Sequence, residues 1–165
     1  MSALPKMVSY YNEQTRISIV VPKEWTGEVI DKSQFRIFGL PEAGFEDYFD
    51  EYRPTMSYTI AEPERLESDW FDEMVVQTGK NMSIEYNEYQ IIDEEWFEVS
   101  GRKSFLRHYE WRDEDTQLQL SQLQSMIYAS PSRFYLVNAA VLKPIVDNYL
   151  PIFDTILRST RIIPA

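Results

Sequence analysis

Between residues 86 and 141, four β-type segments follow one another with only short polar turns between them. Connections of this length cannot hold a crossover helix, so neighbouring strands must run antiparallel. The sequence therefore predicts an antiparallel meander as the centre of the fold. Its expected strands are 86–92, 103–111, 116–128 and 133–141, and its expected turns are 100–102, 113–115 and 130–132.

Alternating apolar side chains predict further strands before this meander. Pro22 ends the second of them, and the following residues, which include Trp25, are expected to form a loop up to about residue 34. Apolar side chains at both Phe35 and Phe38 fall on opposite faces of the next strand, which predicts cover from both sides. The predicted early strands are 7–11, 16–21, 34–40 and 55–60, the first two forming a hairpin around residues 12–14.

Two segments have the spacing of amphipathic helices. The first has an apolar stripe, and Gly79 is expected to end it at 78–80. The second keeps a spacing of three and four from residue 145 to 157, but Pro151 would lose a backbone bond inside a helix, so the helix proper is expected from about Leu150. A short strand within 158–163 is expected to follow. The stripe of the first helix consists of Leu66, Trp70, Phe71, Met74 and Val75.

These elements together predict an α+β protein, an α/β/α sandwich with a mostly antiparallel sheet of about six to eight strands and two main helices. The chain has 165 residues, 44% of them hydrophobic, which is enough to bury about 70% of its unfolded surface in one domain spanning 1–165. No internal repeat or linker divides the sequence.

The net charge of −11 repels phosphate backbones and anionic lipid, so neither nucleic acid nor a stable membrane association is expected. The chain has no cysteine, which excludes disulfides and thiolate metal sites. No segment approaches the roughly 20 apolar residues of a membrane span, and no apolar run near the start is long enough for a signal peptide. These features predict a cytoplasmic protein.

No motif in the sequence indicates catalysis or a cofactor. His108 is the sole histidine, whereas a triad or a zinc site needs well-placed partners. The acids at 93–95 and 113–115 are interpreted as solvated turns, and the five glycines form no phosphate-binding loop. We therefore expect no enzyme, cofactor or metal. The alternative is an enzyme that uses paired carboxylates or a divalent cation, which requires acids to converge near His108 or Asp93.

The segment GFEDYFDEYRP at residues 44–54 carries four aromatic side chains at i, i+3, i+4 and i+7, with acids on the other side. This spacing predicts a short amphipathic helix between two strands. Its aromatic stripe either caps one end of the core or forms an acid-rimmed contact surface for another protein, since Tyr and Phe are enriched at interface cores. The candidate protein-binding residues are Phe45, Tyr48, Phe49 and Tyr52.

The order of several loose motifs resembles the PsbP-like superfamily, which includes the Ran-binding nuclear import factor fold and the bacterial DcrB-like proteins. The Phe-x-Leu-Pro-x-x-Gly segment at 38–44 and the region 101–124 look most like the DcrB-like branch, which includes Eag-type chaperones. The motifs are ISIVVPxxW at 17–25, FRIFGLPEAG at 35–44, GRK at 101–103 leading to YEW at 109–111, the Gln-rich strand 118–124 and FDTILRST at 153–160.

This resemblance implies a non-catalytic accessory protein that binds a protein or an apolar peptide. The binding surface is expected to be an exposed sheet face or the aromatic segment 44–54. One alternative is an Eag-like chaperone that shields transmembrane segments of secreted effectors. Another is a homodimer in which the aromatic segment meets its own copy.

Overall fold

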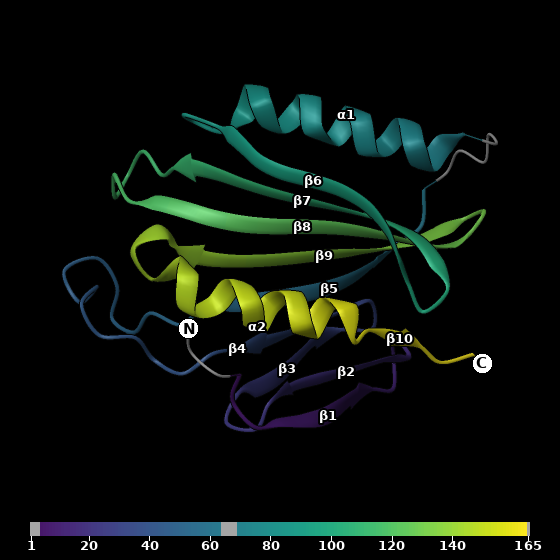
Figure 1. Ribbon diagram of the computed structural model, residues 1–165, viewed down its shortest axis with the longest axis horizontal. Helices are drawn as coiled ribbons and strands as arrows, with labels where there is room; N and C mark the ends of the chain where they lie inside the picture. Colours follow the sequence, from purple (N-terminus) through teal and green to yellow (C-terminus); the bar gives the residue numbers. More distant parts are fainter. Residues whose placement is uncertain (1–3, 64–68, 165) are drawn as a thin grey trace.

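The structure, a computed structural model, describes residues 4–63 and 69–164. A large antiparallel sheet lies between two helices, with a small second sheet beside one end of it (Figure 1). The early elements are β1 (Met7–Asn12), β2 (Ile17–Pro22), β3 (Thr26–Asp31), β4 (Gln34–Phe38), β5 (Thr55–Ala61) and α1 (Trp70–Glu85). The later elements are β6 (Gln90–Val99), β7 (Arg102–Arg112), β8 (Gln119–Ser130), β9 (Arg133–Leu142), the 3-10 turn η1 (Lys143–Ile145), α2 (Val146–Arg158) and β10 (Arg161–Ile162).

The large sheet has seven strands in the order β3-β4-β5-β9-β8-β7-β6, and every neighbouring pair runs antiparallel. The small sheet has the order β1-β2-β10. The predicted meander, the first hairpin, the closing strand and the α+β class are confirmed.

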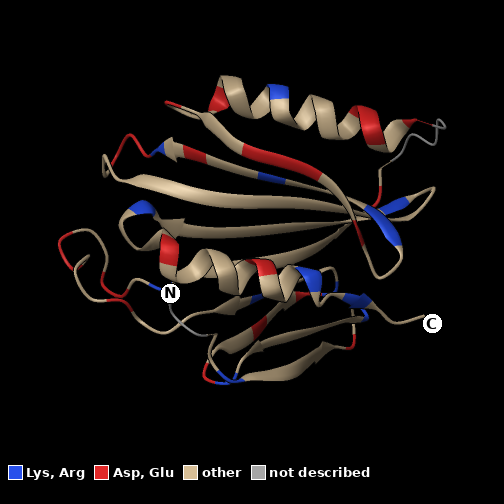
Figure 2. Cartoon of the chain, in the orientation of Figure 1, with Lys and Arg blue, Asp and Glu red and all other residues tan. Residues whose placement is uncertain are grey.

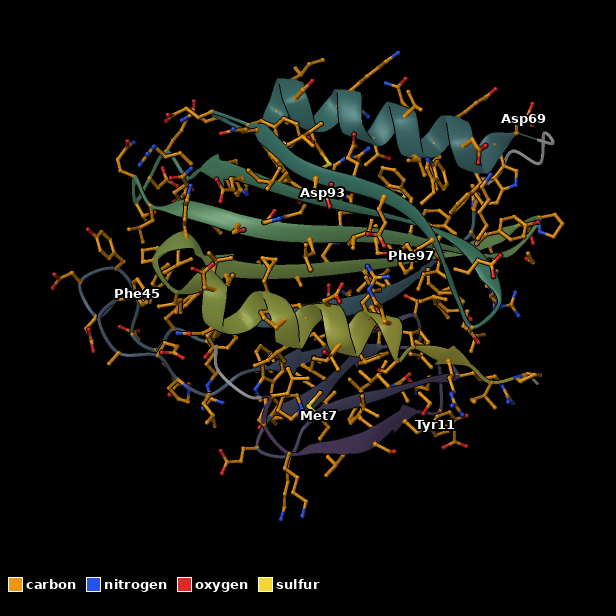
Figure 3. The ribbon with its side chains drawn as sticks, viewed as in Figure 1. Met7, Tyr11, Phe45, Asp69, Asp93 and Phe97 are labelled. Atoms are coloured by element: carbon orange, nitrogen blue, oxygen red, sulfur yellow. The ribbon has the colours of Figure 1, made fainter. Side chains whose placement is uncertain are left out.

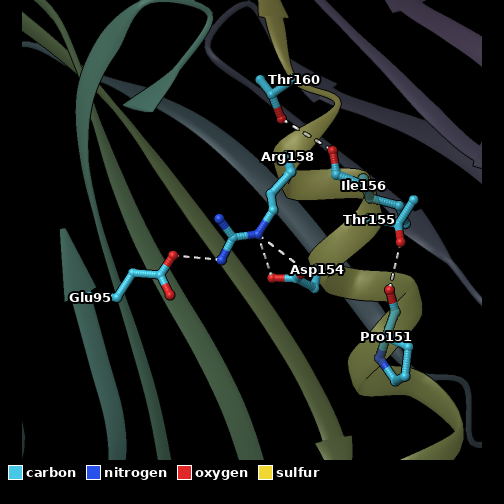
Figure 4. Close-up of polar contacts among 7 residues, drawn as sticks. All are labelled: Glu95, Pro151, Asp154, Thr155, Ile156, Arg158 and Thr160. Atoms are coloured by element: carbon cyan, nitrogen blue, oxygen red, sulfur yellow. Dashed lines mark hydrogen bonds and ion pairs between the residues drawn. The ribbon is translucent and has the colours of Figure 1, made fainter. Parts of the chain in front are cut away.

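The larger core lies between α2 and one face of the large sheet. Phe153, Ile156 and Leu157 of α2 are almost completely buried there, against side chains such as Ile127 of β8. The C-terminal end of α2 also contacts the edge strand β6, because Arg158, which pairs with Asp154 of its own helix, forms an ion pair with Glu95 (Figure 4). The buried apolar side chains hold α2 against the sheet.

The smaller core lies between α1 and the opposite sheet face. Trp70, Phe71 and Val75 of α1 pack against Phe105, Met126 and Phe134 of β7, β8 and β9. Leu66, which belongs to the predicted stripe, lies outside the described residues. α1 lies along the β6 side of the molecule, away from β3 and β4 (Figure 1).

The prediction that α1 ends at Gly79 is wrong, because the helix continues to Glu85. Gly79 serves instead as a close-approach position for Arg107 of β7. A Cβ atom at residue 79 would lie 2.7 Å from Arg107 Nη2, which donates a hydrogen bond to the Val75 carbonyl oxygen. The missing side chain therefore makes room for a buried guanidinium under the helix.

Two strands differ from the prediction. The segment expected as a loop after Trp25 contains β3, whose side chains are all exposed, so no apolar alternation marked it. The acids at 93–95 lie inside β6 rather than in a solvated turn, because β6 begins at Gln90 and extends to Val99. Glu94 there forms an ion pair with Arg107.

Two burial and boundary predictions also fail. The strand at 34–38 is covered on one side only: Phe35 is buried, Phe38 is half-buried, and Leu40 beyond it is exposed. α2 begins at Val146, with Pro151 inside it. Asp147, whose carbonyl would accept from residue 151, and Pro151 are both exposed, so water can replace the lost backbone bond.

Candidate binding surface

A polar row crosses the face of the large sheet that α1 partly covers. One residue from each of the seven strands stands in register: Glu94, Arg107, Gln124, Asn138, Ser57, Arg36 and Glu28. Glutamate–arginine contacts close both ends of the row, at 2.8 Å for Glu94–Arg107 and 3.5 Å for Glu28–Arg36. α1 covers the half of the row on β6, β7 and β8 and leaves the half towards β3 uncovered.

The covered half is a polar network in which Arg107 and Gln124 are buried and Glu94 is partly exposed. Arg107 is 3% exposed, and its guanidinium donates to Glu94, to Gln124 Oε1 at 3.1 Å and to the Val75 carbonyl oxygen at 3.1 Å. The ring of Phe105 lies 4.9 Å from the guanidinium carbon. Such a complete set of partners is what a buried charge requires, so this half fastens α1 to the sheet.

The uncovered half is a surface that we call the open face. Its side chains lie on the α1 side of the sheet beyond the reach of that helix, and most are half-buried. Its charged residues are Glu28, Asp31 and Arg36, all on the two strands β3 and β4, and Glu28 contacts Arg36. The open face consists of Thr26, Glu28, Asp31, Gln34, Arg36, Phe38, Thr55, Ser57, Thr59, Gln122, Asn138 and Ala140.

The charges of the open face sum to −1, whereas the protein carries a net charge of −11, and the part of the face on β5, β9 and β8 has no charged residue. Acidic segments gather elsewhere, on β6 and on the loop 41–54 (Figure 2). Depletion of charged residues is typical of the centre of a protein interface, and Thr55, Ser57, Thr59, Asn138 and Ala140 form such an uncharged area.

The loop 41–54 borders the open face, and it is not the helix that its spacing predicts. Backbone bonds from Gly39 N to Pro54 O and from Glu42 N to Tyr52 O close the base of the loop, each at 2.8 Å. Since these bonds hold the two ends together, the segment between them forms a compact loop with a single turn at residues 46–48.

The loop brings together three of the four aromatic residues that the sequence singled out and leaves Tyr48 exposed. Phe45 is only 8% exposed, and its ring packs edge-on against Tyr52 at 5.1 Å between centroids. Phe49 packs on the other side of Tyr52 at 5.3 Å, and both of these residues are half-buried. Tyr48 is 49% exposed. Contact with a protein through these residues stays a prediction, with Tyr48 offering the largest free surface.

Tyr52 fastens the loop to the sheet. Its hydroxyl accepts a hydrogen bond of 2.8 Å from the backbone N–H of Leu142, at the end of β9. Burial raises the pKa of Tyr52 to about 12, so the phenol stays neutral at physiological pH. A hollow of about 320 Å³ lies where the loop meets the sheet, and Phe49 and Tyr52 share it with Thr55, Trp111 and Ala140. The aromatic loop and the open face therefore form one continuous surface.

His108 and the acids near it form a separate group on the opposite face of the sheet. His108 Nε2 lies 2.7 Å from Ser121 Oγ, and Asp93 stands opposite His108 in the pairing of β6 with β7 but is exposed. Glu110 is buried and pairs with Lys143 at 2.8 Å. Asp93 and Phe45 lie in different parts of the molecule (Figure 3). Within residues 4–63 and 69–164, no three His, Cys, Asp or Glu side chains are placed to hold a metal ion.

The residues of the open face could not be found from the sequence, because they become neighbours only through strand register. A partial signal was present. The predicted strand 116–128 must lie inside the meander, yet its residues 121–125 read Ser-Gln-Leu-Gln-Ser, so polar side chains fall on both of its faces. Polar residues on both faces of a central strand indicate that at least one face is not a simple apolar core.

Comparisons with known proteins identify the fold. LpqN, involved in cell envelope biogenesis of Mycobacterium tuberculosis, superposes with a TM-score of 0.68 at 13% identity, over 96% of this chain and 91% of that one. The Ran-binding protein Mog1p of Saccharomyces cerevisiae gives a TM-score of 0.65 at 10% identity, over 96% of each chain. Cyanobacterial PsbP (CyanoP) from Synechocystis gives 0.63 at 14% identity, over 98% of this chain and 95% of that one.

The chain therefore has a PsbP/Mog1-like fold, as the order of its sequence motifs predicted. No protein-family model matches the sequence. No curated protein matches it in sequence either. Among the described residues, none of the helices has the length and apolar character needed to cross a lipid bilayer.

Proposed function

We propose that this protein is a non-catalytic accessory protein that binds a protein partner through the open face and the bordering loop 41–54. The observation that carries the proposal is a helix-free sheet face to which β5, β9 and β8 contribute only uncharged residues, on a highly charged protein. A partner can cover this uncharged part of the face without desolvating a charge, which is a large cost of burying a polar surface. Tyr48, Phe49 and Tyr52 supply aromatic contacts at its border.

A cytoplasmic location belongs to the same proposal, because a chain without cysteine gains nothing from an oxidising compartment. The narrower proposal, an Eag-like chaperone for transmembrane segments, requires an apolar surface for its client. The hydroxyl and amide side chains of Ser57, Thr59 and Asn138 favour a partner with polar groups of its own. The composition of the open face therefore favours a soluble partner over a membrane-spanning segment.

The test is a pull-down with the full chain, followed by titration of the purified partner into variants by calorimetry. Ser57→Glu places a carboxylate in the centre of the open face, where the neighbouring Arg36 can pair with it and keep the fold stable. Ser83→Glu is the matched control, because Ser83 lies on the exposed surface of α1. Tyr48→Ala tests the loop, where the side chain is exposed and its loss leaves the core intact.

The expected result is a loss of affinity of about tenfold or more for Ser57→Glu, which corresponds to about 1.4 kcal/mol. Tyr48→Ala should weaken binding several-fold, and Ser83→Glu should leave it unchanged. The proposed surface would be refuted if Ser57→Glu and Tyr48→Ala bound the partner as tightly as the unmodified protein and Ser83→Glu do. Recovery of a partner whose membrane-spanning segment alone binds would favour the chaperone instead. Sedimentation at two concentrations separates both from a homodimer, whose sedimentation coefficient rises with concentration.

A further inference from the structure

The strand β6 forms one edge of the large sheet and is open on its outer side. Among the described residues it pairs with β7 alone, so its outer side carries backbone N–H and C=O groups without strand partners. The strand has ten residues, most of them exposed, and neither lysine nor proline lies in it. A bulge between Ile91 and Asp93 interrupts the pairing once, and residues 93–99 then follow in unbroken register with β7. β6 therefore offers an edge long enough to pair with an added strand.

Exposed apolar side chains line this edge. Ile91 and Ile92 are each 45% exposed, and Trp96 is 48% exposed. The Trp96 ring packs against Phe105 at 4.8 Å between centroids, which holds the ring in place while about half of the residue stays open. Apolar side chains beside an unpaired backbone favour strand addition, whereas protected edges carry proline, lysine or a covering element.

The acids on β6 decide which kind of strand fits there. Asp93, Glu94, Glu95 and Glu98 are the charged residues of the strand, and Figure 2 shows the acidic run along it. Like charges opposite each other on neighbouring strands are destabilising, so these acids oppose pairing with a second copy of β6. The same acids favour a strand that carries basic side chains.

Nearby bases offset two of these acids. Arg107 pairs with Glu94 at 2.8 Å, and Arg158 pairs with Glu95 at 2.6 Å. Arg158 also pairs with Asp154 at 2.9 Å, so one guanidinium serves two carboxylates there. The centre of β6 therefore stays acidic in spite of these ion pairs.

The other two acids have no such partner. Asp93 and Glu98 form no ion pair with any residue in the ranges 4–63 and 69–164. His108 lies opposite Asp93, but burial lowers the pKa of His108, so the imidazole is neutral at physiological pH. Lys103 lies opposite Glu98, but its ammonium pairs with Asp72 at 2.6 Å. The carboxylates along β6 therefore outnumber the bases that pair with them.

One face of β6 presents three groups that attract a cation. Glu94, Trp96 and Glu98 stand at alternate positions, so their side chains share the face on which Phe71 of α1 contacts Trp96. The ammonium of Lys103 lies 4.9 Å from the centroid of the Trp96 ring, so this ring already contacts one cation. A strand added to β6 places every second side chain next to this row.

We propose that β6 pairs with an extended basic segment of a partner protein, one that has lysine or arginine at alternate positions. Backbone hydrogen bonds to the open edge supply affinity, and bases that face Glu94, Trp96 and Glu98 supply specificity. The site lies at the opposite edge of the large sheet from β3, and it does not depend on binding at the open face.

The test is amide NMR of the ¹⁵N-labelled full chain at low ionic strength, titrated with three peptides that are blocked at both ends. The basic probe is acetyl-Lys-Val-Lys-Val-Lys-Val-Lys-amide. In one control peptide glutamate replaces every lysine, and in the other proline replaces every valine, which keeps the charge but removes alternate backbone N–H donors. The basic probe should bind about tenfold or more tightly than either control, with the largest shift changes on residues 90–99.

The double variant Asp93→Asn/Glu98→Gln removes two exposed carboxylates and keeps the shape of both side chains, so it should fold normally and bind the basic probe about three- to tenfold more weakly. Asp47→Asn/Asp50→Asn is the matched control, because it removes the same charge from exposed positions in the loop 41–54. This control should bind the basic probe as the unmodified protein does.

The proposal is overturned if either control peptide binds as tightly as the basic probe, if the shift changes fall away from β6 and its neighbour β7, or if the two double variants bind equally. Broadening of the signals of residues 90–99 with rising protein concentration, in the absence of peptide, would assign the edge to a second copy instead.

Discussion

Replacing Gly79 by alanine should destabilise the protein, although the same change inside an ordinary helix stabilises it. In an open helix, Gly→Ala gains about 0.5–1 kcal/mol because glycine loses more backbone entropy on folding. In α1 the new methyl group would lie 2.7 Å from Arg107 Nη2 and 3.1 Å from Cζ. Ordinary contact needs at least 3.4 Å, so the guanidinium must move.

Three partners resist that movement. The guanidinium of Arg107 donates to Glu94 Oε2 at 2.8 Å, to Gln124 Oε1 at 3.1 Å and to the Val75 carbonyl oxygen at 3.1 Å. A hydrogen bond to a charged group contributes about 1.5–3 kcal/mol. Losing one of them outweighs the gain in helix propensity, which gives a net destabilisation of about 1–2 kcal/mol.

Urea denaturation, with Gly79→Ala measured alone and in an Arg107→Met background, tests this reasoning. In the single variant the unfolding free energy should fall by about 1–2 kcal/mol, which lowers the melting temperature by about 2–8 °C in a chain of this size. In the Arg107→Met background the same change should become neutral or stabilising by up to about 1 kcal/mol, because the flexible methionine can yield to the methyl group. Stabilisation by Gly79→Ala alone would refute the account of why this helix contains glycine.

Three further predictions concern stability. Tyr58→Phe removes a fully buried hydroxyl that lies 2.7 Å from Thr160 Oγ1, and it should lower the unfolding free energy in urea by about 0.5–1.5 kcal/mol; no change would mean that this bond contributes nothing. Arg158→Ala breaks exposed ion pairs to Asp154 and Glu95 and should cost less than about 1 kcal/mol, with the cost shrinking in 1 M salt, whereas a larger, salt-independent loss contradicts the assignment. Burial lowers the pKa of His108 below its usual 6.5, so the unfolded chain binds the proton more readily than the folded chain does. The unfolding free energy should therefore be highest above about pH 6.5 and should fall as the pH falls through the folded-state pKa. His108→Gln should remove this part of the pH dependence, measured by thermal melts at about pH 7.5 and about pH 5.

The sequence predicted the elements whose burial is visible in the local spacing of apolar and turn residues. Turn residues and alternating apolar positions marked the meander, and the spacing of Phe153, Ile156 and Leu157 marked α2, because each signal lies within a few neighbouring residues. β3 gave no such signal, since all its side chains are exposed and only its pairing with β4 makes it a strand.

Two of the remaining errors share one physical cause, which is that tertiary contacts decided between local alternatives. Gly79 has the sequence character of a helix end, but Arg107 from a strand 28 positions later explains it. The spacing of Phe45, Phe49 and Tyr52 fits a helix, but backbone bonds at the base of the loop fold it back on itself. The open face arises from the register of seven strands, which no single segment of sequence encodes.

The central proposal, that a partner covers the open face, is tested most directly by amide NMR of the ¹⁵N-labelled chain with and without the purified partner. The account predicts that the largest shift changes and the strongest loss of solvent accessibility fall on Arg36, Ser57 and Asn138 and on Tyr48 in the adjoining loop. Changes confined to the exposed surface of α1, or to α2 and the small sheet, would contradict it.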